Sequence, residues 1–256
     1  MTADHAPVFK DHFSAVAADY AQARPEYPPD LFHWIASVAP ARRLAWEAGC
    51  GSGQASRALA AHFDRVFATD PSAAQVAAAT APANVAFAVE PGERCSLGDA
   101  TADAACVAQA LHWFDRAAWF AECERVLAPG GVLVAWGYQD IQAPPDLEDA
   151  FAAFHAAIAC DWPSERADVD AGYAGYAWPF ELLAPPALAL EADWPLARLL
   201  GYLSSYSATR RHRVRTGDDP VARFAPAIAA AWGDAAATQR LRWPLFVHAR
   251  RKPGRW

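Results

Sequence analysis

The sequence predicts an α/β fold whose parallel sheet is assembled from strand–helix–strand units. Between residues 41 and 137, short apolar runs alternate with stretches whose apolar residues recur at helical spacing. The first apolar run breaks into a glycine-rich turn, and the second ends on an acidic residue. Open sheets of this kind bind ligands at the carboxyl ends of their strands. The predicted strands are residues 43–47, 65–70, 85–89, 104–109 and 131–136.

The glycine-rich turn follows Glu47 and contains Gly49, Gly51 and Gly53. Three glycines in five residues let the backbone adopt positive φ and let a ligand approach it closely. The dinucleotide fingerprint G-x-G-x-x-G requires a glycine where Gln54 stands. The Glu47 carboxylate would also repel a pyrophosphate, whereas it suits a ligand with an amino group and a sulfonium. The turn therefore favours S-adenosylmethionine, and an ordinary glycine-rich turn is the alternative.

Asp70 ends the second apolar run and is followed by Pro71. In βαβ nucleotide folds, an acid about 20 residues after the glycines hydrogen-bonds the ribose hydroxyls. The alternative is that Asp70 caps the next helix, although Ser72 is suited to cap that helix itself. We therefore predict that Asp70 and Pro71 lie at the cofactor.

Helices are predicted around these strands in a regular order. Two precede the first strand within residues 1–40, joined by a stiff proline-rich connection at residues 24–29. In the core, helices are expected after Gly53, from Ser72 and from Asp115. The last of these should stop at residues 129–131, where a proline precedes two glycines.

Residues 138–184 interrupt the alternation with several prolines, one apolar helical pattern and a cluster of aromatic residues. We expect this insertion to cover the active site as an aromatic cap and to select the substrate. Residues 185–256 are expected to complete the core sheet. They contain candidate strands near 188–194 and 241–249, with two helices between them.

The chain resembles the class I methyltransferases, and within them the small bacterial and fungal enzymes of the type 11, trans-aconitate methyltransferase-like group. Residues 47–53 and 125–131 indicate a methyltransferase, whereas residues 20–28 and 109–115 indicate the subfamily. The resemblance implies a Rossmann-like, doubly wound, seven-stranded sheet (residues 41–137 and 185–256) whose last strand is antiparallel. It also implies that residues 1–40 fold over the cofactor as a helical lid.

The resemblance further implies roles for individual residues. In the loop after the third strand, Pro91 replaces the usual aspartate, so adenine recognition is carried over to Glu93 and to the backbone near Gly92, with a solvated acidic loop as the alternative. Backbone near Gln109 and Ala110 is expected to meet the methionine part of the cofactor. His112 is expected near the methyl group, and a packed core histidine is the alternative. The implied substrate contacts are Tyr20, Arg24, Tyr27, His112, Trp113, Tyr206 and Arg210.

Composition restricts the partners. A net charge of −7 disfavours nucleic acid, whose phosphates need a broad positive field. The basic cluster at residues 210–215 is interpreted as a solvated edge, with an anionic-substrate contact as the alternative. The five cysteines are scattered and predict neither a disulfide framework nor a metal site. No apolar run approaches the roughly 18 residues of a membrane span, so we expect a soluble cytoplasmic protein, monomeric or homodimeric, without a membrane or nucleic-acid partner.

The predicted function is S-adenosylmethionine-dependent O-methylation of a carboxylate or hydroxyl group on a small molecule. Methyl transfer releases a neutral thioether, so the protein must chiefly align the reactants, which can supply roughly 7–11 kcal/mol. A carboxylate acceptor needs no base and would use Arg24 as its cation, whereas a hydroxyl acceptor would need His112 as a base. The alternatives are a non-catalytic S-adenosylmethionine-binding module and, disfavoured by Glu47 and Gln54, a nicotinamide-dependent oxidoreductase.

Overall fold

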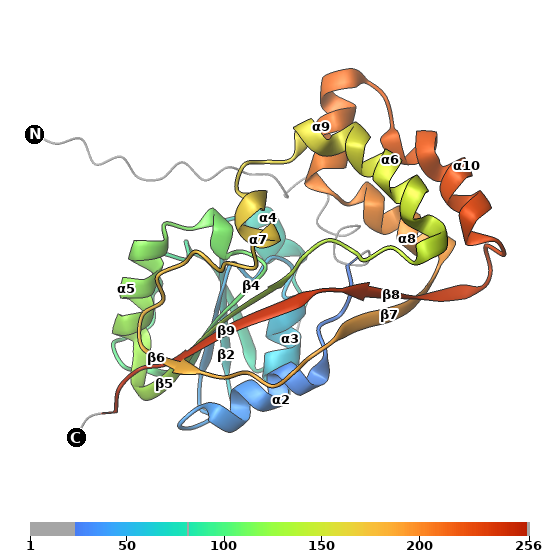
Figure 1. Cartoon of the computed structure of the whole chain (residues 1–256). Helices are drawn as coiled ribbons and strands as arrows, with labels where there is room; N and C mark the ends of the chain where they lie inside the picture. Colours follow the sequence, from blue (N-terminus) through green and yellow to red (C-terminus); the bar gives the residue numbers. More distant parts are fainter. Residues whose placement is uncertain (1–23, 81, 255–256) are drawn as a thin grey trace, which may run out of the picture.

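The structure of the chain, a computed structural model, describes residues 24–80 and 82–254. Its largest element is a seven-stranded sheet with the order β3-β2-β1-β4-β5-β9-β6 (Figure 1). Strands β1 to β5 run parallel, while β9 runs antiparallel to its neighbours β5 and β6. The predicted seven-stranded sheet with an antiparallel last strand is therefore confirmed. Its strands are β1 (Ala45–Ala48), β2 (Val66–Asp70), β3 (Val85–Val89), β4 (Ala102–Ala108), β5 (Leu127–Tyr138), β6 (Glu181–Leu183) and β9 (Leu245–Arg251).

All five strands predicted for the core are present, and the largest difference lies at the start of β5. Helix α5 (Arg116–Val126) ends before Pro129, and β5 begins at Leu127 instead of residue 131. A proline disfavours helical backbone in the residue before it. Leu127 already pairs with Ala102 of β4. The helix therefore stops earlier than the Pro-Gly-Gly sequence suggested.

Helices cover both faces of the sheet, as a doubly wound fold requires. On one face, α2 (Pro29–Val38) and α3 (Gln54–Ala60) bury Leu31 and Leu59 in a cluster that includes Ala45 of β1. On the other face, α5 buries Trp119 in a cluster that includes Trp46, the next residue of β1. Because successive strand residues point to opposite faces, the two clusters lie on opposite sides of the sheet. The short helix α4 (Ala73–Ala78) connects β2 with β3.

The position of α2 corrects the part of the lid prediction that covers residues 29–38. Leu31, Phe32 and Ile35 are buried in the cluster that contains Val134 and Trp136 of β5, so α2 covers the sheet. The apolar face of this helix is thus explained by core packing. The earlier part of the predicted lid, residues 1–23, lies outside the described residues.

A second unit is built largely from the C-terminal part of the chain and has its own core. Helices α6 (Glu148–Ile158), α8 (Leu196–Ser204), α9 (Ser207–Thr216) and α10 (Pro220–Trp232) gather beside the sheet in Figure 1. Their shared cluster includes Phe154, Leu199 and Ile228. Strands β7 (Leu190–Pro195) and β8 (Thr238–Trp243) pair only with each other.

This arrangement corrects the prediction that residues 185–256 complete the core sheet. Only β9 of that range joins the sheet, and β6 comes from the segment predicted as the cap. Trp194 and Trp243, on the paired strands β7 and β8, are buried in the helical unit instead. Pro244, which cannot donate a backbone hydrogen bond, separates β8 from β9.

The aromatic part of the predicted cap, residues 173–180, also lies elsewhere. Tyr173 is buried on the α5 face of the sheet, and Tyr176, Trp178 and Phe180 pack against the same cluster. Trp178 stacks on His248 of β9, with ring centroids 4.5 Å apart. These side chains therefore extend the core of the sheet and do not form an aromatic cap.

The basic cluster at residues 210–215 lies on α9, where two of its arginines form ion pairs. Arg213 contacts Asp219 at 2.8 Å, and Arg215 donates two hydrogen bonds of 2.7 Å to Asp161. His212 Nδ1 lies 2.9 Å from the same Asp161 carboxylate. The cluster thus ties α9 to the end of the segment after α6. Among the residues described, no helix combines the length and apolarity needed to cross a membrane.

We predict that Asp161→Asn lowers the free energy of unfolding at pH 7 by about 1.5–3 kcal/mol, because Asp161 is buried and its charged hydrogen bonds are lost. Hydrogen bonds from Arg215 lower the pKa of Asp161 to about 2. This contribution is present at pH 7 and disappears as the pH falls from about 4 towards 2.

The matched control is Asp193→Asn, which breaks an Arg240 pair whose aspartate side chain is 53% exposed. This control should lower the free energy of unfolding much less than Asp161→Asn, because solvent screens an exposed ion pair. Urea unfolding of both variants at several pH values measures the difference. Equal losses for the two variants would contradict the structural role of Asp161.

Candidate active site

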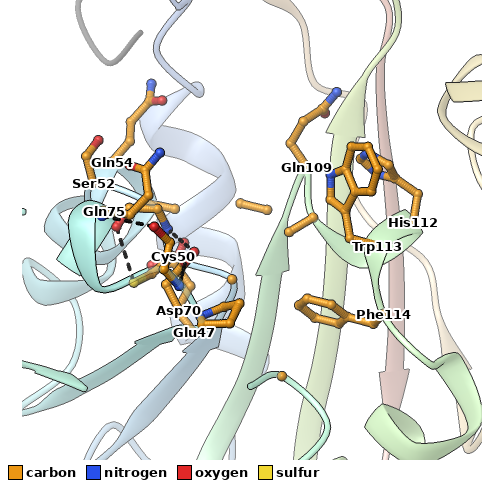
Figure 2. A pocket seen from close by; sticks show the side chains of 18 of the residues that line it. Glu47, Cys50, Ser52, Gln54, Asp70, Gln75, Gln109, His112, Trp113 and Phe114 are labelled. Carbon is orange, nitrogen blue, oxygen red and sulfur yellow. Dashed lines mark hydrogen bonds between the residues drawn. The ribbon is translucent and has the colours of Figure 1, made fainter. Parts of the chain in front are cut away.

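A cavity of about 340 Å³ lies at the carboxyl ends of β1, β2 and β4. The strand order reverses between β1 and β4, and open α/β sheets bind ligands at such a reversal. Figure 2 shows the side chains of Glu47, Asp70 and Gln75 facing those of His112 and Trp113 across this cavity. The cavity therefore has a wall built by β1 and β2 and a wall built by the loop after β4.

The glycine turn brings the two walls together. Gly49 and Gly53 adopt φ angles of +68° and +82°, which strongly favour glycine. A Cβ on Gly49 would lie 2.7 Å from the Cβ of Ala110 and 3.0 Å from the ring of Phe114. A Cβ on Gly51 would meet nothing closer than 3.9 Å, so the backbone there is open to a ligand.

Glu47 is a buried carboxyl group on the β1 wall. Its side chain is 1% exposed and accepts a short hydrogen bond from the hydroxyl of Ser56. Burial raises the pKa of Glu47 to about 8, and the nearby charge of Asp70 adds to this effect. The carboxyl group is therefore mostly protonated at pH 7, and a cationic ligand beside it would favour the ionised form.

Asp70 connects the glycine turn to the start of α4. Its Oδ2 accepts a hydrogen bond of 2.9 Å from the Gly51 N–H, and its Oδ1 accepts one of 2.8 Å from the Ser72 N–H. The helix cap is Ser72, whose hydroxyl accepts a hydrogen bond from the Gln75 N–H. The interpretation of Asp70 as a helix cap is therefore wrong. Asp70 and Pro71 both line the cavity.

The other wall begins at Gln109, which adopts a φ of +54°. Its side chain accepts a 2.7 Å hydrogen bond from the Tyr138 N–H and donates one of 3.1 Å to the Tyr138 carbonyl. Its own N–H donates to the carbonyl of Trp136. These bonds extend the β4–β5 pairing past the end of β4. They hold Gln109 and Ala110 on the cavity lining. Contact of these two residues with the cofactor stays a prediction.

Glu93 lines the cavity and is anchored to α5. Its Oε1 accepts a hydrogen bond of 2.9 Å from the N–H of Asp115, the capping residue of that helix. Gly92 packs against the ring of Phe114, because a Cβ there would lie 2.7 Å from two ring carbons. These contacts fix the position of Glu93 on the cavity lining. Its recognition of adenine stays a prediction.

His112 and Trp113 lie in the short 3-10 helix η2 (Leu111–Trp113) after β4. His112 Nδ1 lies 2.9 Å from the hydroxyl of Tyr173. Burial lowers the pKa of His112 to about 4, and the positive charge of Arg166 contributes a smaller part of this shift. The imidazole is therefore neutral at pH 7 and a weak base.

Arg24 and Tyr27 line the cavity from the segment ahead of α2. Arg24 donates hydrogen bonds of 3.3 Å to the Tyr138 hydroxyl and 3.5 Å to the Ser205 carbonyl. The ring centroids of Tyr27 and Tyr138 lie 6.0 Å apart. Gln54 of α3 donates a 2.8 Å hydrogen bond to the Pro25 carbonyl, which ties this segment to the glycine turn.

Three predicted site residues do not reach the cavity lining. Gly53 starts α3 with its Cα facing Phe87. Tyr206 is buried in the helical unit, where its hydroxyl donates to Asp140, and Arg210 lies on α9. Both were assigned by resemblance, and the separate core of the helical unit holds them away from the cavity. Tyr20 lies outside the described residues.

Several lining residues were not predicted from the sequence. Ser72 and Gln75 follow Asp70 at the start of a helix. Their closeness in sequence to Asp70 could have predicted that they line the cavity. Tyr138 and Glu165 carry no such signal, because tertiary packing alone brings them to the cavity. The additional lining residues are Cys50, Ser52, Gln54, Ala55, Ser72, Gln75, Pro91, Ala108, Phe114, Tyr138 and Glu165.

The fold and this site define a Rossmann-like protein that binds a nucleoside ligand at the switch point of its sheet. A ligand in this cavity would approach the backbone at Gly51 and lie beside the carboxylate of Asp70 and the buried carboxyl group of Glu47. A ribose and an amino group satisfy the two carboxyl groups, whereas a pyrophosphate would be repelled by them. In residues 24–80 and 82–254, no cluster of His, Cys, Asp and Glu is arranged to hold a metal ion.

Comparisons with known proteins agree with this class. The family model of a methyltransferase domain matches residues 46–135. A Dictyostelium discoideum protein named as a methyltransferase is 30% identical over 204 residues, 78% of each chain. An uncharacterised Mycobacterium tuberculosis methyltransferase is 36% identical over 131 residues, 50% of this chain and 53% of its own length. A solved structure described as a type II methyltransferase, from Anaeromyxobacter dehalogenans, is 44% identical with a TM-score of 0.84, covering 91% of this chain and 99% of its own.

The chain belongs to the class I S-adenosylmethionine-dependent methyltransferases. Its cofactor is S-adenosylmethionine, and the glycine turn, the buried Glu47 and the carboxylate of Asp70 fit that molecule. This assignment replaces the nicotinamide-dependent alternative. The narrower, trans-aconitate methyltransferase-like subfamily stays a prediction.

We predict that Asp70→Asn weakens the binding of S-adenosylhomocysteine by about 10- to 100-fold. The loss corresponds to one charge-assisted hydrogen bond, about 1.5–3 kcal/mol. Asp64→Asn, at an exposed residue away from the cavity lining, is the control and should bind normally. Isothermal titration calorimetry measures both variants. Unchanged affinity in Asp70→Asn would show that Asp70 only shapes the turn.

A second prediction concerns the proton on Glu47. Because burial raises the pKa of Glu47 to about 8, the free protein holds this proton at pH 7. The ammonium group of S-adenosylhomocysteine should displace it, so binding at pH 7 releases a proton and tightens as the pH rises towards 8. Calorimetry in buffers of different ionisation enthalpy counts the proton. Glu47→Gln should abolish the release, and proton-neutral binding by the unmodified chain would refute this coupling.

Proposed function

We propose that the chain transfers a methyl group from S-adenosylmethionine to an oxygen of a small carboxylate-bearing acceptor, as expected of the trans-aconitate methyltransferase-like group. The cofactor supplies an electrophilic methyl group on its sulfonium. The observation that carries the proposal is the pairing, on one cavity lining, of the cation Arg24 with a histidine of lowered pKa.

The weak basicity of His112 favours a carboxylate over a hydroxyl acceptor. General-base catalysis works best when the pKa of the base lies near the working pH. Burial lowers the pKa of His112 to about 4, so this imidazole has little tendency to remove the proton of an alcohol or phenol at pH 7. A carboxylate, with an ordinary pKa near 4, is already ionised and needs no base.

The charge distribution supports the same acceptor. The chain has a net charge of −7, and the Asp70 carboxylate adds negative charge to the wall built by β1 and β2. An anionic acceptor therefore needs local positive charge. Arg24 supplies it at the edge between the sheet and the helical unit, where Tyr138 and Ser205 orient its guanidinium.

Alignment is the remaining task of the protein. Trp113 and Tyr27 line the cavity with aromatic surface, and Arg24 and His112 line it with polar groups. Fixed walls of this kind hold a nucleophile in line with the methyl group, a contribution of roughly 7–11 kcal/mol in favourable cases. Turnover of an acceptor also separates this function from a non-catalytic binding module.

We predict that Arg24→Ala lowers kcat/KM for a carboxylate acceptor by about 10- to 100-fold, the value of a charge-assisted hydrogen bond. Arg210→Ala is the matched control and should leave kcat/KM unchanged, because Arg210 is not on the cavity lining. The assay follows S-adenosylhomocysteine formation with trans-aconitate, other small di- and tricarboxylates, and phenols.

At saturating cofactor, carboxylate methylation should vary little between pH 6 and 8, because His112 does not change protonation in this range. Methylation of phenols alone, lost in His112→Ala and rising through a pKa between 6 and 7, would refute the carboxylate acceptor.

A further inference from the structure

Tyr173 is a buried residue held firmly beneath the histidine of the active site. It is 1% exposed and adopts a φ of +57°, which is uncommon for a residue with a side chain. Its N–H donates a 2.9 Å hydrogen bond to the Asp168 carbonyl, and its ring stacks on Tyr176 with centroids 4.9 Å apart. The ring of Phe246 packs edge-on against it. Several independent contacts therefore fix where the Tyr173 hydroxyl lies.

This hydroxyl lies at the start of η2 and beside the ring of His112. The distance from its oxygen to His112 Nδ1 is 2.9 Å. The first N–H groups of a helix have no partner inside the helix. In η2 these belong to Leu111 and His112, and both favour the ionised form of the Tyr173 hydroxyl, but burial outweighs them and raises the pKa of Tyr173. The hydroxyl therefore keeps its proton and can donate it in a hydrogen bond.

The direction of the bond between Tyr173 and His112 follows from counting donors. A phenol has one proton and two lone pairs. If His112 carried its proton on Nδ1, that N–H would donate to the Tyr173 oxygen, and the buried O–H of Tyr173 would lack an acceptor in this contact. With the proton on Nε2, Nδ1 accepts from the Tyr173 O–H and each group has a partner.

We propose that Tyr173 is a positioning residue that holds His112 in the tautomer with the proton on Nε2. Nδ1 faces Tyr173, so Nε2 is the nitrogen that His112 can present to the cavity it lines. Trp113 fixes the ring further, with centroids 4.7 Å apart. This inference rests on the proposed function and deepens it.

With this tautomer, His112 presents a hydrogen-bond donor to the cavity and cannot act as the general base that a hydroxyl acceptor would need. An Nε2–H group has no lone pair with which to take a proton from a hydroxyl acceptor. It can donate a hydrogen bond to an anionic oxygen, which fits the carboxylate oxygen of the proposed acceptor. Glu165 and Asp168 attract a proton towards the imidazole while Arg166 repels it, and burial keeps the ring neutral.

The test is the tautomer of His112 in the full chain, labelled with 15N-histidine and observed by long-range 1H–15N NMR at pH 7. Spectra are recorded alone and with S-adenosylhomocysteine, and His112→Gln identifies the signals. We expect one neutral tautomer with the proton on Nε2 in both samples. A proton on Nδ1, or an equal mixture of tautomers, would overturn the inference.

Two variants separate positioning from general packing. Tyr173→Phe removes only the hydroxyl and should cause loss of the single Nε2–H tautomer. Tyr176→Phe is the matched control: its hydroxyl donates to Asp168 and not to His112, so the tautomer should stay unchanged. An unchanged tautomer in a folded Tyr173→Phe protein would refute the role of Tyr173. If that variant does not fold, the spectrum of the unmodified chain still decides the tautomer.

These measurements do not depend on turnover. A proton on Nδ1 would remove this inference while carboxylate methylation could still be observed. Failure to methylate any carboxylate would refute the proposed acceptor without changing the result for the His112 tautomer.

Discussion

The site depends on the close contact between the glycine turn after β1 and the loop after β4. Gly49 can take its left-handed φ, and its missing Cβ leaves room for Ala110 and Phe114. Any side chain there would push η2, and with it His112, away from the β1 wall. The same contact sets the width of the cavity and the position of the wall built by the loop after β4. Backbone geometry at one residue therefore determines where two chemically different groups of side chains meet.

Electrostatics then divides the cavity into two ends. Glu47 and Asp70 make the β1–β2 wall acidic, and burial keeps Glu47 protonated until a cation arrives. Arg24 brings positive charge from the segment ahead of α2, and a neutral His112 adds a polar group without charge. A cationic cofactor and an anionic acceptor fit this distribution. The sheet, its helices and the helical unit serve to hold these few groups at fixed positions.

The sequence predicted the core of the fold because strand and helix periodicities there follow from burial. The glycines and Asp70 could be assigned for the same local reason, since they end consecutive strands on one edge of the sheet. Prediction failed where tertiary packing decided: α2 covers the sheet, β7 and β8 pair apart from it, and residues 173–180 join the core. Tyr206 and Arg210 were wrongly assigned to the cavity. The helical pattern of their sequence predicts a helix, but it does not predict how far that helix lies from the cavity. Tyr138, Glu165 and the contact of Tyr173 with His112 were missed for the same reason.

A crystal structure of the chain with S-adenosylhomocysteine would show which wall of the cavity holds each part of the cofactor. We expect the ribose hydroxyls to contact the Asp70 carboxylate, the amino group of the ligand to lie next to Glu47, and the sulfur to face the wall formed by His112 and Trp113. A ligand bound away from Asp70 and Glu47, or oriented with its sulfur away from His112, would contradict this expectation.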